Sequence, residues 1–251
     1  MAESILDIEH LTHAFPQGRG GIFDVSFSVS SGEFIILAGR NGSGKTTLIR
    51  HLNGLLRPQA GKVLIHKENI FKNLTQTRKR VGMVFQDADT QIVGDTVFDE
   101  VAFGPENLKI PRSLINEKVF QVLERLDLIQ FKDRNPATLS GGEKRKLTIA
   151  GILVMEPEII VFDEPFANLD YPSTQSILTA IRDLNQRGQT LIMATHEVET
   201  VIDFAPRLLI MEEGRLMEDG PSALLREKLE PYGIKQPCSC KMEKKSMPWQ
   251  P

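Results

Sequence analysis

A glycine-rich stretch carries the first residues whose types and spacing predict chemistry. The sequence GRNGSGKTT follows an apolar run that reads as a buried strand, and the residues after it read as a helix. This is the G-x-x-x-x-G-K-[ST] spacing of a phosphate-binding loop, whose glycines let backbone N–H groups face phosphate oxygens. Lys45 is suited to reach the β- and γ-phosphates, and Thr46 to place its hydroxyl on Mg²⁺. We therefore predict a nucleotide-binding loop made of Gly39, Arg40, Asn41, Gly42, Ser43, Gly44, Lys45, Thr46 and Thr47.

Two adjacent carboxylates follow a second apolar run, IIVF, which suits a strand buried on both faces. Asp163 emerges at the carboxyl end of this strand, where open α/β sheets bind ligands. We expect it to support Mg²⁺, through a water molecule. Glu164 is placed to act as the general base for a water that attacks the γ-phosphate. The alternative is a solvated strand end, which the neighbouring phosphate loop makes the weaker interpretation.

Two further polar residues end predicted strands. Gln86 follows VGMVF, and we expect it to contact both Mg²⁺ and the attacking water. His196 follows TLIMAT, and we expect it to bond the γ-phosphate. A lone glutamine or histidine is usually structural, so the position at a strand end carries these two predictions.

A second candidate anion site lies about a hundred residues after the first, in the sequence TLSGGEKRKLTIAG. Here a hydroxyl and two glycines, Ser140, Gly141 and Gly142, directly precede a predicted helix. Exposed N–H groups at such a helix start favour a negatively charged ligand. The chain therefore holds two candidate phosphate sites. The sequence must also explain which phosphate the second site binds.

The pattern along the chain predicts a scaffold that positions these residues. Alternating apolar residues over 5–15 and 22–30 indicate strands. After a mostly helical insert at about 87–155, strands and helices alternate again as EIIVF, STQSILTAIRDLNQRG, TLIMAT, EVETVIDF and RLLIM. This alternation is typical of an α/β fold with a largely parallel sheet and helices on both faces. We expect one domain over 1–227 and a loosely ordered tail over 228–251, rich in Pro, Lys and Ser.

Composition excludes several classes of protein. The net charge is −3 and the isoelectric point about 6.0, which argues against a broad nucleic-acid surface, so we expect no nucleic-acid partner. The apolar runs are too short to cross a bilayer, and the first residues lack an apolar signal region, so we expect a protein on the cytosolic side whose membrane link comes through a partner. The sequence has only two cysteines, Cys238 and Cys240, which is too few for a disulfide framework. Their C-x-C spacing is either part of an unremarkable tail or, with weaker support, a metal or redox site.

Together these motifs resemble the ATP-binding subunits of ABC transporters, in order and over most of the chain. The resemblance implies a P-loop NTPase (ABC ATPase) core with an N-terminal antiparallel β subdomain and a helical insert. It also implies that ATP and Mg²⁺ are bound and that ATP is hydrolysed. The matching motifs are the P-loop at 39–47, Gln86, the signature LSGGE at 139–143, Asp163 with Glu164, NLD at 168–170 and His196.

The resemblance also implies a dimer. In that family two ATPase domains sandwich two ATPs head to tail, so that the signature of one subunit covers the nucleotide of the other. Ser140, Gly141, Gly142 and Glu143 would then act in trans, and Asp170 would lie at the interface. The partner is a second ATPase subunit, identical or related, and a two-fold axis makes each surface both donor and acceptor.

Two positions depart from the wider family pattern. Glu143 stands where glutamine is usual, although glutamate is common in one subgroup. The adenine-stacking aromatic, usually tyrosine, would be Phe15, which keeps a π face without the hydroxyl.

A narrower resemblance, to the ATPases of energy-coupling-factor transporters, rests on the D-x-x-x-Q after Gln86 and on the segment AFGPEN. It implies a place on the cytoplasmic side of the cell membrane as a peripheral subunit. The partners would be a transmembrane coupling protein and a substrate-binding membrane protein, and the cargo a transition metal such as cobalt or nickel, or a vitamin. Part of an apolar set would form the docking groove for coupling helices, namely Ile92, Val93, Val97, Phe98, Val101 and Phe103.

Three alternatives stay open at this point. The chain could serve a conventional ABC importer or an exporter. A soluble ABC ATPase acting on nucleic acid or ribosomes is less favoured, because such proteins often join two ATPase domains or carry coiled-coil or zinc inserts. A catalytically dead regulatory module is disfavoured by the intact Lys45, Glu164 and His196.

Overall fold

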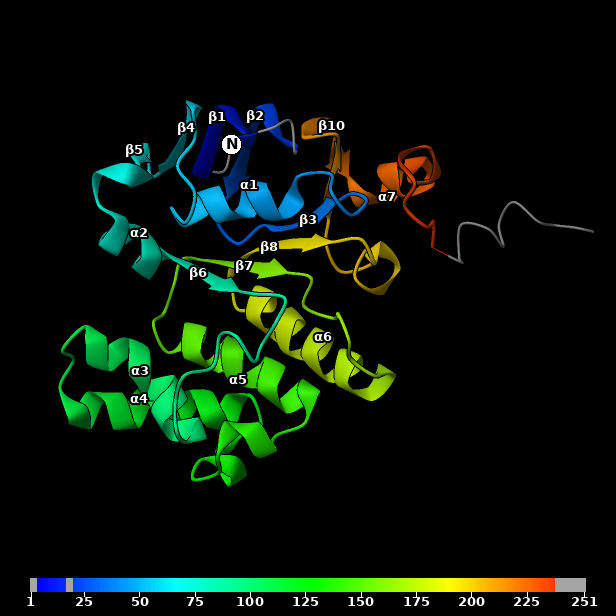
Figure 1. Ribbon diagram of the computed structural model, residues 1–251. Coiled ribbons are helices and arrows are strands. Elements are labelled where there is room, and N and C mark those ends of the chain that lie inside the picture. Colours follow the sequence, from blue (N-terminus) through cyan, green and yellow to red (C-terminus); the bar gives the residue numbers. More distant parts are fainter. Residues whose placement is uncertain (1–3, 17–19, 238–251) are drawn as a thin grey trace, which may run out of the picture. The chain divides into compact units, whose positions relative to one another are not determined.

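The computed structural model describes residues 4–16 and 20–237. The chain divides into two compact units (Figure 1). The first combines Met1–Lys72 with Ile192–Pro251, and the second is the continuous segment Asn73–Leu191.

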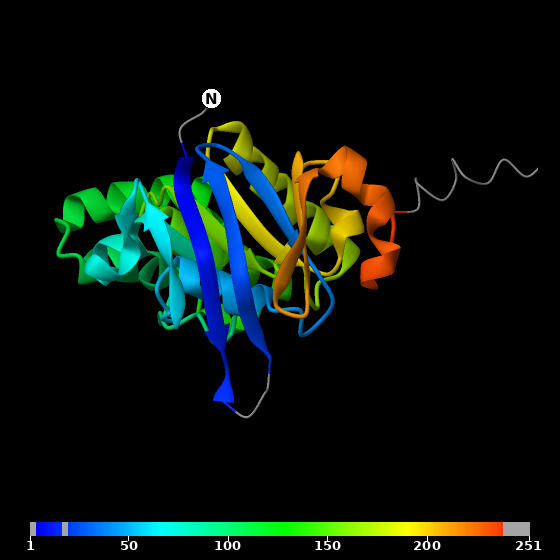
Figure 2. The same ribbon diagram turned by 90° about the horizontal axis from the view of Figure 1, so that it is seen from above.

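An antiparallel sheet forms the N-terminal part of the first unit. It contains β1 (Ser4–Ala14), β2 (Gly21–Ser30), β4 (Ala60–Ile65) and β5 (Glu68–Asn69), in the order β2-β1-β4-β5. Figure 2 shows β1 and β2 running side by side as a long hairpin. Alternate residues of β2 from Val25 to Val29 are buried, as expected for a strand with one face on a core. The predicted N-terminal antiparallel subdomain is therefore confirmed.

The phosphate-loop strand of the first unit lies in a parallel pair. β3 (Phe34–Ala38) is fully buried and pairs in parallel with β9 (Arg207–Glu212), and β10 (Arg215–Pro221) pairs antiparallel with β9. The helix α1 (Lys45–Leu52) follows the loop after β3. β8 (Thr190–Thr195), buried throughout, carries the chain from the second unit back to the first.

One arginine ties three strands of this unit together. Arg207, at the start of β9, donates to the carbonyl of Ser28 at 2.8 Å and to Glu33 at 3.0 Å. Its other nitrogens reach the carboxylate of Asp219 on β10, each at 2.6 Å. These carboxylates raise the pKa of Arg207, so its charge is fixed at any physiological pH.

The end of the first unit is more ordered than the sequence suggested. After α7 (Ser222–Leu225) the chain makes 3₁₀ turns at 226–228 and 230–232, and Leu229 and Ile234 are buried. The sequence predicted a loosely ordered tail from residue 228, because the segment is rich in Lys and Pro. In the structure, Leu229 and Ile234 instead pack residues 228–237 onto the unit. Cys238 and Cys240 lie outside the described residues.

The second unit pairs two parallel strands with a group of helices, labelled in Figure 1. β6 (Val81–Val84) and β7 (Ile159–Asp163) are parallel, with Val84 opposite Phe162. The remaining elements are α2 (Leu74–Arg80), α3 (Val97–Asn107), α4 (Arg112–Arg125), α5 (Gly141–Leu153) and α6 (Tyr171–Gln186). Three of them, α3 to α5, occupy the predicted insert at 87–155. The α/β fold with parallel strand pairs is confirmed.

Local predictions failed where apolar periodicity misled or was absent. The segment EVETVIDF was read as a helix, but it forms only a 3₁₀ turn at Val198–Thr200, because β-branched residues and the following Pro206 disfavour a longer helix. The strand VGMVF ends at Val84, one residue early. Within the described residues no helix is long and apolar enough to cross a membrane.

Candidate active site

Glycines shape the loop between β3 and α1. Gly42 and Gly44 have φ values of 84° and 102°, a region that strains other residues. A Cβ on Gly39 would stand 2.3 Å from Ser43 Oγ and 2.6 Å from the carbonyl of Met211, so no side chain fits. Gly44 is the N-cap of α1, and among the described residues no side chain caps it. The first N–H groups of this helix therefore suit an anion.

Lys45 closes the loop on itself. Its Nζ is buried and donates to the carbonyl of Gly39 at 2.7 Å and to that of Arg40 at 3.3 Å. Neutral carbonyls are weaker partners for an ammonium group than phosphate oxygens. These two hydrogen bonds keep the ammonium group at the loop, where phosphate oxygens would be stronger acceptors.

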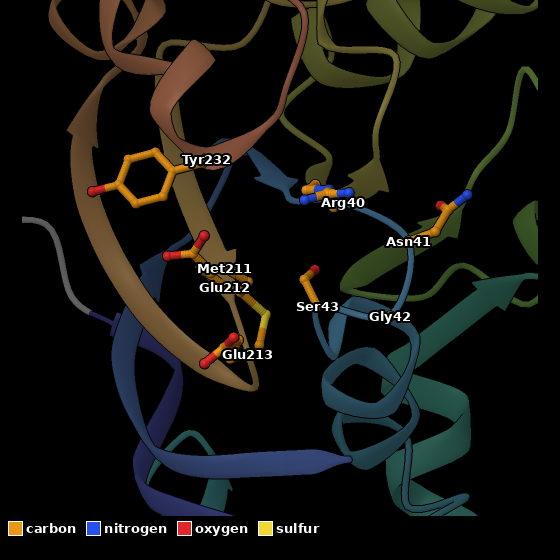
Figure 3. Close-up of a pocket in the computed structure, with 8 residues that line it drawn as sticks. All are labelled: Arg40, Asn41, Gly42, Ser43, Met211, Glu212, Glu213 and Tyr232. Carbon is orange, nitrogen blue, oxygen red and sulfur yellow. The ribbon is translucent and has the colours of Figure 1, made fainter. Parts of the chain in front are cut away.

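The side chain of Ser43 supports the interpretation that the loop fits a phosphate, because it offers a buried hydroxyl to a ligand. Its hydroxyl is buried, with the residue 5 % exposed, and Oγ has no hydrogen-bond partner among the described residues. The backbone around it is fixed, since its carbonyl accepts from the N–H of Gly214 at 3.0 Å. Beside it lies a pocket of about 170 Å³ (Figure 3). The pocket is lined by Arg40, Asn41, Gly42, Ser43, Met211, Glu212, Glu213 and Tyr232.

The predicted adenine platform, Phe15, belongs to a small ring cluster. Its ring meets His13 edge-on at 4.8 Å between centroids, and His13 meets His51 of α1 at 4.9 Å. His51 Nδ1 donates to the carbonyl of Thr47 at 2.7 Å. Burial lowers the pKa of His51 to about 4, so this ring is neutral at pH 7. Neither histidine was predicted from the sequence, although His13 lies two residues before Phe15 and His51 lies four residues after the phosphate loop.

The carboxylates that follow β7 are both buried. Asp163 is the last residue of the strand, and Glu164 adopts a left-handed conformation with φ 47°. Such a conformation in a non-glycine residue costs on the order of 1–3 kcal/mol and is typical of functional turns. The carbonyl of Glu164 accepts from the N–H of Ala167 at 3.2 Å, which holds the turn.

Gln86 and His196 are exposed residues just beyond strands. Gln86 lies two residues after β6, and its carbonyl accepts from Arg145 Nη2 at 2.5 Å. His196 directly follows β8, where the N–H of Glu197 donates to Thr195 Oγ1 at 3.0 Å and turns the chain. Both positions agree with the strand ends expected from the sequence.

The second anion site begins the helix α5, with Ser140 as its N-cap. A capping box links Ser140 and Glu143: the serine N–H and hydroxyl lie 2.7 Å from Glu143 Oε2, and Ser140 Oγ accepts from the Glu143 N–H at 3.3 Å. The hydrogen bond from the Ser140 N–H, and then that from its hydroxyl, lower the pKa of Glu143. The carboxylate is therefore charged and engaged with the residue that begins the helix.

This helix start lies beside the loop before α6. A Cβ on Gly142 would stand 2.7 Å from Ser173 Oγ, and one on Gly141 would stand 3.5 Å from Leu169. Asp170 caps α6 by accepting from the N–H of Ser173 at 3.0 Å, and the Ser173 hydrogen bonds lower the pKa of Asp170. The structure thus brings the LSGGE and NLD motifs together.

Each unit carries its own part of the predicted site. Phe15, the loop at 39–47 and His196 belong to the first unit. The second holds Gln86, 140–143, Asp163, Glu164 and Asp170.

The predicted Mg²⁺ ligands all supply oxygen. They are the hydroxyl of Thr46, the amide of Gln86 and the carboxylate of Asp163, which match a hard cation that keeps several waters and phosphate oxygens. Within 4–16 and 20–237, no group of three or more His, Cys, Asp or Glu residues could hold a metal ion. This donor set fits a metal that arrives with a nucleotide.

Comparison with known proteins gives one family and many relatives. A model described as ABC transporter matches residues 22–167. The cobalt import ATP-binding protein CbiO of Rhodobacter capsulatus is 41% identical, over 93% of this chain and 85% of that protein. The energy-coupling factor transporter ATP-binding protein EcfA of Carboxydothermus hydrogenoformans is 38% identical, over 94% of this chain and 89% of that protein.

A solved structure shares the fold. It is cbiO1 of Clostridium perfringens, described as part of the ABC transporter complex cbiONQ. It superposes with a TM-score of 0.83 and 32% identity, covering 91% of this chain and 93% of that one.

Proposed function

Because the chain belongs to the ABC transporter family of ATP-binding proteins, we propose that it is one of two ATPase subunits of an energy-coupling-factor importer. The chain is an ATPase by family membership. The observation that carries the narrower proposal is the extent of the similarity: relatives named for cobalt import and for energy coupling match along 93% and 94% of the chain.

ATP binds at the loop between β3 and α1 in this proposal. The N–H groups at the start of α1 and the ammonium of Lys45 hold the phosphates. The hydroxyl of Ser43, which has no partner among the described residues, can bond a phosphate there. Phe15 offers its face to adenine. Thr46 with Gln86, and Asp163 through a water molecule, would hold Mg²⁺, which would supply positive charge against the phosphates.

Hydrolysis depends on three residues with separate tasks. Glu164 takes a proton from the attacking water as general base. Gln86 orients that water, and His196 bonds the γ-phosphate. The buried, left-handed turn at Glu164 supports this assignment, because strained turns persist where surrounding structure holds a group for a purpose.

A complete site requires a second ATPase subunit, either a copy of this chain or a relative. Ser140, Gly141, Gly142 and Glu143 then cover the nucleotide of the partner, and Asp170 lies at the interface. The closeness of the LSGGE and NLD motifs within the second unit supports this, because a partner that meets one of them would also lie near the other.

Membrane association comes through other proteins in this proposal, on the cytoplasmic side. Val93 and Phe103 are exposed apolar residues, with 62 % and 52 % of their surface accessible. They suit the coupling helices of a transmembrane partner, which works with a substrate-binding membrane protein. The cargo is a transition metal ion such as cobalt or nickel, or a vitamin.

The test is reconstitution with partners. The chain is purified from membranes of its own cells with its associated proteins, which are identified, and uptake of cobalt, nickel and vitamins into vesicles is measured with and without ATP. Co-purifying coupling and substrate-binding proteins with ATP-dependent uptake support the proposal. Association with two large membrane domains of a conventional importer or exporter, or with ribosomes, would replace it.

A further inference from the structure

The helix that carries the LSGGE motif holds a buried arginine whose role no motif explains. Arg145 lies on α5 and is only 3 % exposed. Its Nη1 donates to the carbonyl of Phe85 and its Nη2 to the carbonyl of Gln86, the latter at 2.5 Å. Sixty residues of chain separate Arg145 from Phe85, so this contact joins two distant segments.

Burying this charge is costly for the fold. Desolvation lowers the pKa of Arg145, with the nearby carboxylate of Asp87 acting in the opposite direction, and Nε has no partner among the described residues. A methionine or leucine would pack here without that cost. The arginine therefore needs a reason beyond packing, and its two carbonyl partners are the visible one.

A second contact joins the same helix to the same loop. Lys144, the residue before Arg145, places Nζ 2.6 Å from Asp89 Oδ1. The lysine side chain is mostly buried, whereas the aspartate is exposed. Two successive residues of α5 thus hold two points of the loop that follows β6.

The loop is also closed internally. Gln91 Oε1 accepts from the N–H of Phe85 at 3.0 Å, and Gln91 Nε2 donates to the carbonyl of Met83 at 3.2 Å. These bonds make 85–91 a compact turn whose backbone conformation is restrained. A displacement of α5 would carry this turn, and Gln86 with it.

We propose that Arg145 is a positioning residue that fixes Gln86 relative to the LSGGE helix. It acts through the carbonyls of Phe85 and Gln86, leaving the Gln86 side chain exposed for the attacking water. Because Ser140 begins the same helix, movement of that motif and movement of Gln86 become one event. This inference rests on the proposed role of Gln86 in hydrolysis.

The experiment is a double-mutant cycle on steady-state ATP hydrolysis, using the full chain with its partners. Arg145→Met should lower kcat by roughly 10–100-fold, because small misplacements of catalytic groups have effects of this size. The KM for ATP and the melting temperature should change little. In a Gln86→Ala background, Arg145→Met should add less than about a twofold further loss, since its effect passes through Gln86.

Two more variants keep the test sharp. Arg145→Lys keeps the buried charge and one donor, so it serves if the methionine variant does not fold, and its kcat should fall between those of wild type and Gln86→Ala. Lys146→Met is the matched control: it removes the next basic residue of α5, whose Nζ lies 3.8 Å from Asp127 instead, and kcat should be unchanged.

The outcomes separate this inference from the proposed function. No hydrolysis by the wild-type chain with its partners, or a normal kcat in Gln86→Ala, overturns the proposed roles first. If wild type hydrolyses ATP and Gln86→Ala is slow, two results overturn the positioning role alone. One is that the losses of Arg145→Met and Gln86→Ala are additive. The other is that Arg145→Met lowers kcat no more than the control Lys146→Met does.

Discussion

Lys45 Nζ lies 2.7 Å from the carbonyl oxygen of Gly39, the first residue of its own loop. The ammonium group thus bridges the two ends of the phosphate loop. We predict that Lys45→Met lowers ATP affinity by at least about 10–100-fold, because one or two charge-assisted hydrogen bonds are lost. Titration of a fluorescent ATP analogue measures this. Arg50→Met, on the exposed side of the same helix, is the control, and ATP binding within about twofold of wild type in Lys45→Met would contradict the loop assignment.

Glu164→Gln should separate binding from hydrolysis. The amide keeps the size of the buried side chain but cannot take a proton from water. We predict unchanged ATP affinity, hydrolysis lower by roughly 10²–10⁴-fold, and an ATP-dependent dimer visible by size-exclusion chromatography. A steady-state rate close to that of wild type would remove Glu164 from the role of base.

Damage to the two phosphate sites should be complementary between chains. Lys45→Ala disables one P-loop, and Ser140→Arg blocks the signature with a bulky cation. In a head-to-tail homodimer, mixing the two variants leaves one intact site in each mixed dimer, whereas each variant alone has none. We predict that the mixture regains measurable hydrolysis. Mixed dimers that form, as shown with differently tagged chains, yet stay inactive would argue against the head-to-tail arrangement.

Phe103 is an exposed member of the apolar set predicted to dock the coupling helices. Val97 and Val101 are fully buried on α3, so they pack the unit, while Phe103 is 52 % exposed. We predict that Phe103→Gln leaves the melting temperature and ATP affinity unchanged but abolishes co-purification with membrane subunits. Leu224→Gln, an equally apolar and 69 % exposed position in the first unit, should still assemble. Normal assembly of both variants would place the docking groove elsewhere.

His51 should make the fold sensitive to mild acid. Because burial lowers its folded-state pKa from 6.5 to about 4, the folded protein favours the neutral ring. The stability this contributes is full above pH 6.5 and is lost as pH falls toward 4. Between pH 7.5 and 5 the loss is on the order of 2 kcal/mol from this one group. Urea unfolding at both pH values should show a smaller loss in His51→Gln than in wild type; equal losses in the two proteins would contradict the assignment.

The parts of the fold that could be predicted from the sequence are those where one local pattern was sufficient. β3 and β7 are fully buried strands, so both read as continuous apolar runs with polar chemistry directly after them. β10 has no such pattern, because alternate residues are only partly covered, and α2 is a short basic helix without an apolar face. Neither element could be found from periodicity alone.

Contacts between distant residues were the other limit. The positions of Gln86 and Ser140 followed from motifs, but the arginine that links their segments resembles an ordinary surface residue in a basic run, EKRK. Likewise, the ring contact between His13 and His51 depends on how β1 meets α1. Such pairings are set by packing of the whole unit, and a single sequence has no local signal for them.

The discontinuous first unit has a consequence for how the chain is made. Arg207 must reach Ser28, 179 residues earlier in the chain, and β3 must wait for β9 before its parallel pair can form. At a synthesis rate of about 5–20 residues per second, the strand before the phosphate loop stays without that neighbour for roughly 9–34 s. Asn73–Leu191 is continuous and leaves the ribosome complete during this interval. The nucleotide loop therefore reaches its final environment late in synthesis, and the edge of β3 that later pairs with β9 is open to wrong strand pairing until then.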